Sequence, residues 1–296
     1  MKMPKLAPGS PEWIRCVTAS KIPSILGISR YQSQFALWHQ MAGLVEPAPI
    51  DEPTQELFDF GHASEKAARE YWLLRNPGWR ASTGEVQFHL PELGFPNAAT
   101  IDLRASRGRA RKIVEVKAPR SLEEFGDDGS GEIPADHAAQ ITWQMLVSGI
   151  HDADLVAWPA FGYPRIYPVQ WDPEVAEVIL DRVRAWVASL DAGVPPELDN
   201  SVTTYECLKR LNPDIDRDAE VELDEDLATA YLRAVADQKL VDAEVRAAKI
   251  RVLDAMGRAQ YATCRGHRIA DRRNGRGDSV SLYANTRSDF LKDVAA

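Results

Sequence analysis

The sequence contains few cysteines: only Cys16, Cys207 and Cys264, far apart along 296 residues. Their number and spacing match no zinc motif and fall short of the four thiolates that usually hold an iron–sulfur cluster. A chain of this length and composition can bury a core without disulfides. We therefore predict three reduced, buried thiols, as in a cytosolic protein.

Long apolar runs are also absent. No stretch approaches the length of a membrane span, and the N-terminus (MKMPKLAPGSPEW) has lysines but neither an apolar core region nor a small-residue cleavage pattern. His62, His137 and His267 show no metal-ligand spacing, so we expect them to be structural or surface residues. These absences predict a soluble, cytoplasmic protein without a membrane partner.

Basic charge is in deficit, because the chain carries a net charge of −9. This argues weakly against nucleic acid as a partner, since duplex DNA attracts basic surfaces. The charge is unevenly distributed, however: acidic residues concentrate after Asp191, whereas residues 104–112 read RASRGRARK. A basic loop close to carboxylates would suit a phosphodiester site, and a solvated hairpin tip is the alternative.

Hydrophobic periodicity and turn residues predict a mixture of helices and strands up to about residue 191. Residues 18–43 read as two helices broken around Gly27 to Tyr31, with Thr18 or Ser20 as an N-cap, and 45–56 as an acidic linker. The further expected helices are 60–76, 134–149 and 173–191, and the expected strands are 84–90, 98–104, 111–118, 153–159 and 165–170.

The character of the sequence changes after Pro195 and Pro196. Residues 224–256 predict one long helix, with candidate buried positions at Leu227, Tyr231, Val235, Val241, Val245, Val252 and Met256. Residues 260–274 predict a β-hairpin that turns at Arg265–Gly266. We therefore expect two domains, 1–195 and 196–296.

The strand at 113–118 reads IVEVKA and places an acid and a lysine two residues apart. Because side chains alternate along a strand, Glu115 and Lys117 share one face with Ile113. An isolated pattern of this kind is usually an exposed ion pair. Here, antiparallel pairing with the preceding strand would bring Asp102 near Glu115. Two carboxylates and a lysine supply the oxygen ligands for magnesium and the positive group that phosphodiester cleavage needs.

The order Asp102 … Glu115-Val116-Lys117 resembles the PD-(D/E)XK nuclease signature. Over roughly residues 13–170 the sequence is similar to the YqaJ-type branch, which includes phage lambda exonuclease. The stretches that carry this resemblance are VTASKI (17–22), ILGIS (25–29), FGHASE (60–65), TID (100–102), EVK (115–117) and QITWQM (140–145). The resemblance implies an α/β (α+β) fold with a restriction-endonuclease-like core, in which helices flank a central mixed sheet, plus a C-terminal helical arm and β-hairpin.

The resemblance also implies roles for individual residues. Asp102, Glu115, Glu65 and the backbone carbonyl of Val116 would bind metal, two Mg²⁺ ions that Mn²⁺ could replace. Lys117 and Gln140 would complete the catalytic set, and Ser20, Thr100, Gln140 and Arg15 would hold a 5′-phosphate. Simpler alternatives exist: Glu65 as an exposed helical acid, Gln140 and Gln144 as a polar helix face, and Ser20 as an N-cap.

Two departures from the family pattern affect these expectations. The family's serine-proline-aspartate-glycine is replaced by Thr100-Ile101-Asp102-Leu103, which loses the tight turn. The family's phosphate-binding arginine aligns near Trp13, and the nearest arginine is Arg15. The 5′-phosphate requirement is therefore left open.

The function implied by the resemblance is a magnesium-dependent 5′→3′ exonuclease on double-stranded DNA ends. It would act in phage-type homologous recombination in the bacterial cytoplasm, with a single-strand annealing protein as partner and a ring trimer as assembly. One alternative is a PD-(D/E)XK endonuclease or a Cas4-like single-strand nuclease, against which the missing fourth cysteine counts. Another is a catalytically inactive DNA-binding assembly protein, against which the complete Glu65, Asp102, Glu115 and Lys117 set counts.

Overall fold

The computed structural model describes residues 1–275, 279–286 and 288–295. The chain forms two compact units, residues 1–215 and 216–296. The predicted boundary between 195 and 196 lies inside the first unit, because α7 (Val202–Leu211) packs on α3 (Gln34–Met41). Within the described ranges, no helix is long and apolar enough to cross a membrane.

The first unit contains a five-stranded sheet in the order β2-β5-β6-β7-β8. Its strands are Arg80–Ala81, Leu103–Arg107, Ala110–Lys117, Asp152–Ala157 and Arg165–Gln170. The β6–β7 pair is parallel and the other pairs are antiparallel. A three-stranded sheet beside it joins β1 (Val17–Thr18), β4 (Asn97–Ile101) and β3 (Val86–Phe88).

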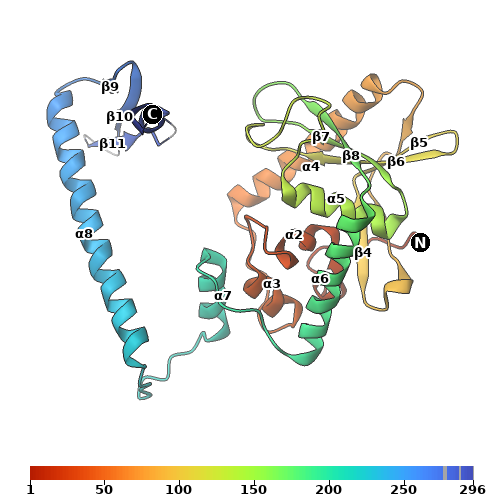
Figure 1. Ribbon diagram of the computed structural model, residues 1–296, viewed down its shortest axis with the longest axis horizontal. Coiled ribbons are helices and arrows are strands. Elements are labelled where there is room, and N and C mark those ends of the chain that lie inside the picture. Colours follow the sequence, from red (N-terminus) through yellow and green to blue (C-terminus); the bar gives the residue numbers. More distant parts are fainter. Residues whose placement is uncertain (276–278, 287, 296) are drawn as a thin grey trace. The chain divides into compact units, whose positions relative to one another are not determined.

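Helices cover both faces of the larger sheet (Figure 1). The α5 helix (Ala135–Ser148) packs on one face, where Ile113 and Leu155 belong to the main core, and α6 (Pro173–Ala192) packs on α5. On the opposite face, Ala68 and Trp72 of α4 (Glu52–Arg75) cover Val114. Alternation along β6 thus supplies both cores, and the predicted mixed sheet flanked by helices is confirmed.

Several predicted elements differ in extent. The linker predicted at 45–56 was wrong from Glu52 onward, because α4 begins there, eight residues before its predicted start. The Asp51 carboxylate caps this helix by accepting a hydrogen bond from Thr54 N (3.0 Å). The buried positions of α4 are Ser64, Ala68 and Trp72. Near the N-terminus the elements are α1 (Pro11–Arg15), η1 (Ala19–Lys21) and α2 (Ile22–Ile25), and η2 (Pro91–Leu93) follows β3.

In the second unit, α8 (Glu225–Met256) begins and ends as predicted. The hairpin of β9 (Tyr261–Cys264) and β10 (His267–Asn274) turns at Arg265 and Gly266, whose φ angles of 47° and 81° suit a two-residue hairpin turn. β11 (Val280–Ala284), α9 (Phe290–Ala295) and α7 were not anticipated.

Two burial predictions were wrong. Among the described residues of α8 only Met256 is buried, next to β9, whereas candidates such as Leu227 and Val241 are more than half exposed. Helical periodicity identified an apolar stripe, but periodicity does not show whether another element covers it. Likewise Cys16 and Cys207 are buried free thiols, while Cys264 is exposed on β9.

Candidate active site

Asp102 occupies the bend at which the chain passes from β4 in one sheet to β5 in the other. The β5–β6 register pairs Leu103 with Val114, so Asp102 stands one position further, opposite Glu115. The backbone N–H of Val116 donates to Asp102 Oδ2 at 2.8 Å, which fixes the carboxylate against β6. The predicted proximity of Asp102 and Glu115 is confirmed.

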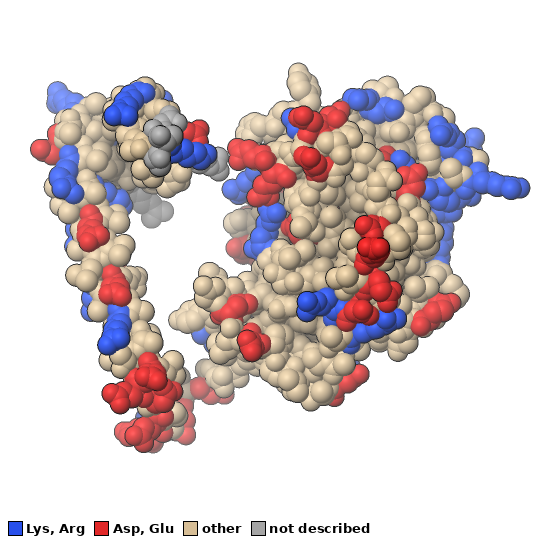
Figure 2. All heavy atoms as spheres, viewed as in Figure 1, with Lys and Arg blue, Asp and Glu red and all other residues tan. Residues whose placement is uncertain are grey.

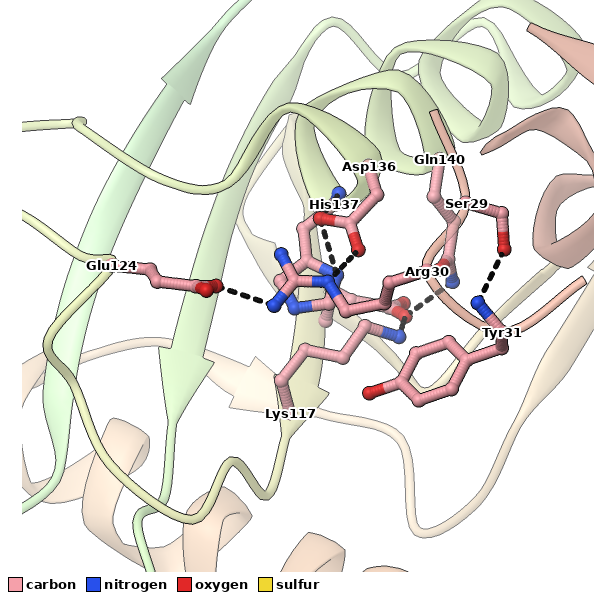
Figure 3. A network of polar contacts seen from close by, with 9 residues as sticks. Ser29, Arg30, Tyr31, Lys117, Glu124, Asp136, His137 and Gln140 are labelled. Atoms are coloured by element: carbon pink, nitrogen blue, oxygen red, sulfur yellow. Dashed lines mark hydrogen bonds and ion pairs between the residues drawn. The ribbon is translucent and has the colours of Figure 1, made fainter. Parts of the chain in front are cut away.

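Glu115 is buried, with 1% of its surface exposed, and accepts three hydrogen bonds. Lys117 Nζ and Gln140 Nε2 each donate to Oε1 at 2.6 Å, and Gln144 Nε2 donates to Oε2 at 2.7 Å. Figure 3 shows Lys117 of β6 and Gln140 of α5 converging on one point. The two alternatives, an exposed ion pair on β6 and a solvent-facing glutamine row on α5, are therefore wrong.

The site holds two carboxyl groups, those of Asp102 and Glu115, but one lysine, Lys117. Burial, and then the nearby Glu115 carboxylate, raise the pKa of Asp102 well above its usual value. Burial alone would lower the pKa of Lys117, but Glu115 and Asp102 outweigh it and raise that pKa, so the side chain stays an ammonium. Two carboxylates thus share one lysine, and a cation placed between them would be stabilised.

Glu65 of α4 is half-buried and does not hydrogen-bond to this pair. Burial is the main cause of its raised pKa, and the Glu115 carboxylate adds a smaller contribution. Within the described part of the chain, no three acidic, histidine or cysteine side chains lie close enough together to form a metal centre. The structure therefore joins two of the predicted metal ligands, and the role of Glu65 stays a prediction.

The predicted phosphate-binding residues lie on separate elements. Ser20 is exposed within η1, where its hydroxyl lies 3.0 Å from that of Thr18. Thr18 occupies the N-cap position of η1, as predicted, although its side chain makes no capping hydrogen bond. Thr100 Oγ1 accepts from Gln87 Nε2 at 2.7 Å. Arg15 is exposed at the end of α1, and no hydrogen bond or ion pair among the described residues links it to Glu115.

Gln144 is a positioning residue whose role the sequence did not reveal. Its Nε2 donates to both Glu115 and the backbone oxygen of Thr100 (2.8 Å), so it connects β4, β6 and α5. Its Oε1 is buried and has no partner among the described residues. The i,i+4 spacing from Gln140 indicated a shared helix face, but only the packing of α5 on the sheet shows that the face points at Glu115.

Arg30 was missed entirely, although it directly follows the ILGIS stretch. Its guanidinium bonds to the Glu124 carboxylate and lies 3.3 Å from Asp136 Oδ2, as Figure 3 shows. With Lys117, Arg120 and His137 it lines a hollow of about 320 Å³. Burial, with a lesser effect of Lys117, lowers the pKa of His137 to about 4, so the imidazole is neutral at pH 7.

Two comparisons with known proteins found matches. The model of the YqaJ-like viral recombinase domain matches residues 13–151. A crystal structure of an alkaline exonuclease (LHK-Exo) from Laribacter hongkongensis is 17% identical, with a TM-score of 0.47 over 61% of this chain and 90% of that chain. The same enzyme in complex with dAMP is 17% identical, with a TM-score of 0.48 over 67% and 93%.

No curated protein matches the chain. The segment from residue 13 to residue 151, which holds Asp102, Glu115, Lys117 and Gln140, matches the YqaJ-like viral recombinase domain, in agreement with the resemblance seen in the sequence.

Proposed function

We propose that this protein is a metal-dependent deoxyribonuclease that digests double-stranded DNA from its ends, as in phage-type recombination. The observation that carries the proposal is the Asp102–Glu115 pair beside Lys117 within a YqaJ-like domain. On the basis of the same resemblance we also propose a 5′→3′ polarity, a single-strand annealing partner and assembly as a ring trimer.

The donor atoms fit a hard divalent cation. Asp102 and Glu115 would hold Mg²⁺ or Mn²⁺, with Glu65 and the carbonyl of Val116 as further oxygen ligands, because such ions prefer carboxylate and carbonyl oxygen. When bound, the metal polarises the phosphoryl oxygens and lowers the pKa of a coordinated water. Ionising both carboxylates beside one lysine is unfavourable, as the raised pKa of Asp102 indicates, and a divalent cation would offset that cost in place of the proton.

The protein's own groups position the reaction. Lys117 keeps its positive charge beside Glu115, where it orients the attacking water or offsets charge that develops on the phosphoryl group. Gln140 and Gln144 hold the Glu115 carboxylate in one orientation from α5. Such supporting bonds restrict the ligand geometry, and their loss typically costs about 10–100-fold in metal affinity or activity.

Asp102→Asn should raise the melting temperature of the metal-free protein at neutral pH. The folded protein holds the Asp102 proton more tightly than the unfolded chain does, so the stability contributed by this group falls as pH rises from its ordinary pKa through the raised one. The advantage of the variant should therefore shrink as pH is lowered. Asparagine is nearly isosteric, and its Oδ1 can still accept from Val116 N.

In the presence of Mg²⁺, the wild type should instead melt at a higher temperature than Asp102→Asn. A ligand present at 100 times its Kd stabilises the folded state by about 2.7 kcal/mol. Thermal unfolding with and without Mg²⁺ should show a larger rise for the wild type than for Asp102→Asn. Equal shifts in both proteins would remove Asp102 from the metal site.

End-labelled linear duplex should be degraded in Mg²⁺, whereas covalently closed circles should be spared and chelation should stop the reaction. If Ser20 and Thr100 hold a terminal phosphate, removal of the 5′-phosphate should slow digestion by the wild type more than by Ser20→Ala. Efficient cutting of closed circles would favour the endonuclease alternative. Equal rates on both kinds of end would reject only the phosphate pocket.

A further inference from the structure

The β5–β6 hairpin is strongly basic within an acidic chain. Residues 103–114 contain five cations and no acid, although the net charge of the protein is −9. The cations are Arg104, Arg107, Arg109, Arg111 and Lys112. Figure 2 shows Lys and Arg side chains gathered at the edge where Figure 1 places this hairpin.

Strand alternation divides four of these cations between the two faces of the sheet, and Arg109 lies in the turn between the strands. Along β6, Arg111 lies on the same face as Glu115 and Lys117, because they are separated by even numbers of residues. Arg104 of β5 pairs with Ile113, which belongs to the core under α5 and marks that face. Arg104 and Arg111 are therefore on the catalytic face.

A third cation joins them from the neighbouring strand. The register pairs Ser106 of β5 with Arg111 on one side and with Arg80 of β2 on the other. Directly paired residues point to the same face, so Arg80 and Arg111 flank Ser106 there. Both arginines are exposed.

Arg107 and Lys112 lie on the opposite face, where each side chain already has an interaction partner. The Arg107 guanidinium stacks over the Trp79 ring at 4.9 Å. Lys112 Nζ lies 2.9 Å from Asp154 and 3.2 Å from Asp152. Both cations thus already have partners on that face.

The three cations of the catalytic face have no such partner. Among the residues that the structure describes, Arg80, Arg104 and Arg111 form no ion pair. Arg111 donates to the backbone oxygens of Gly108 and Ala110, both at 2.8 Å, which orients its guanidinium without neutralising it.

The strand spacing sets the distance of each cation from the carboxylate pair. Arg104 lies two residues along β5 from Asp102. Ser106, which is level with Arg80 and Arg111, lies four residues from Asp102. At about 3.4 Å per residue these are separations of about 7 Å and 14 Å. A duplex advances about 3.4 Å per base pair, so they correspond to about two and four base pairs.

We propose, resting on the deoxyribonuclease function proposed above, that Arg104, Arg111 and Arg80 bind backbone phosphates of the duplex about two to four base pairs from the scissile phosphate. Arg80 and Arg111 are exposed at the end of this face, beyond the buried Ile113, where a duplex can reach them. Because phosphate contacts bear no sequence information, this track suits an enzyme that digests any sequence.

The salt dependence of DNA binding tests whether these arginines bind phosphates, because it can be measured without DNA cleavage. With a duplex end in chelator, the slope of log K against log salt should become shallower by about 0.9 for each phosphate that Arg104→Ala or Arg111→Ala no longer neutralises. Arg107→Ala is the matched control, because it removes the same charge from the same hairpin on the opposite face. An equal change of slope in Arg107→Ala would overturn the proposal, as would unchanged slopes in both test variants.

Single neutral methylphosphonates locate the phosphate that Arg111 binds. Substitution about four base pairs from the end should weaken binding by the wild type and by Arg107→Ala, but not by Arg111→Ala, which has no guanidinium to bind that phosphate. Equal weakening of all three proteins would overturn the proposal. Melting temperatures near that of the wild type confirm that each variant is folded. Since binding is read in chelator, an inactive enzyme with an intact arginine track would reject the proposed function and leave this inference standing.

Discussion

Replacing Asp102 by asparagine is expected to abolish DNA cleavage while DNA binding is largely retained. Stabilisation of phosphoryl charge by a bound metal is worth several kcal/mol, and about 4 kcal/mol corresponds to a rate loss on the order of a thousandfold. Binding should survive because phosphate contacts elsewhere supply most of the affinity. Glu115→Gln should lose a similar factor, and some stability as well, because a glutamine amide faces the donors of Lys117, Gln140 and Gln144.

Single-turnover cleavage and equilibrium binding should be measured on the same duplex. Asp152→Asn is the matched control, because this carboxylate lies on the same sheet but pairs with Lys112 away from the site. Turnover close to that of the wild type in Asp102→Asn would reject the metal-ligand assignment. Loss of binding in parallel with cleavage would instead indicate that the DNA-binding surface of the variant is damaged.

Lys117→Gln is expected to lower the cleavage rate by orders of magnitude with little effect on melting temperature. Glutamine keeps an N–H donor near Glu115 but removes the positive charge that the reaction requires. Lys117→Ala should in addition lower the melting temperature, because breaking a buried pair can cost about 3–5 kcal/mol, less here since two glutamines remain bonded to Glu115.

Lys112→Ala provides the opposite pattern. It removes a lysine from a partly buried pair with Asp154 on the other face of the same strand, so it should lower the melting temperature and leave cleavage intact. Rates and melting temperatures of Lys117→Gln, Lys117→Ala and Lys112→Ala therefore separate catalysis from stability. If activity followed melting temperature across the three variants, Lys117 would be a structural residue only.

Local geometry was sufficient for the centre of the site. Alternation along β6 put Glu115 and Lys117 on one face, and antiparallel pairing across a hairpin put Asp102 beside Glu115, as the register confirms. The Arg265–Gly266 turn was predictable for the same reason, because a two-residue hairpin needs positive φ angles at both positions. Each of these features depends on residues within one hairpin.

Features that depend on distant segments could not be predicted in this way. Glu115 is buried because α5 packs over β6 and donates Gln140 and Gln144 to it, and Arg30 reaches the neighbourhood of Lys117 from a loop before α3. The apolar stripe of α8 was visible in the sequence, yet most of it is exposed. The sequence by itself determined which side chains share a strand face and which residues form each hairpin, since those follow from backbone periodicity. Which faces are covered, and hence which charges are desolvated, was decided only by the tertiary structure, because burial depends on contacts between segments far apart in the chain.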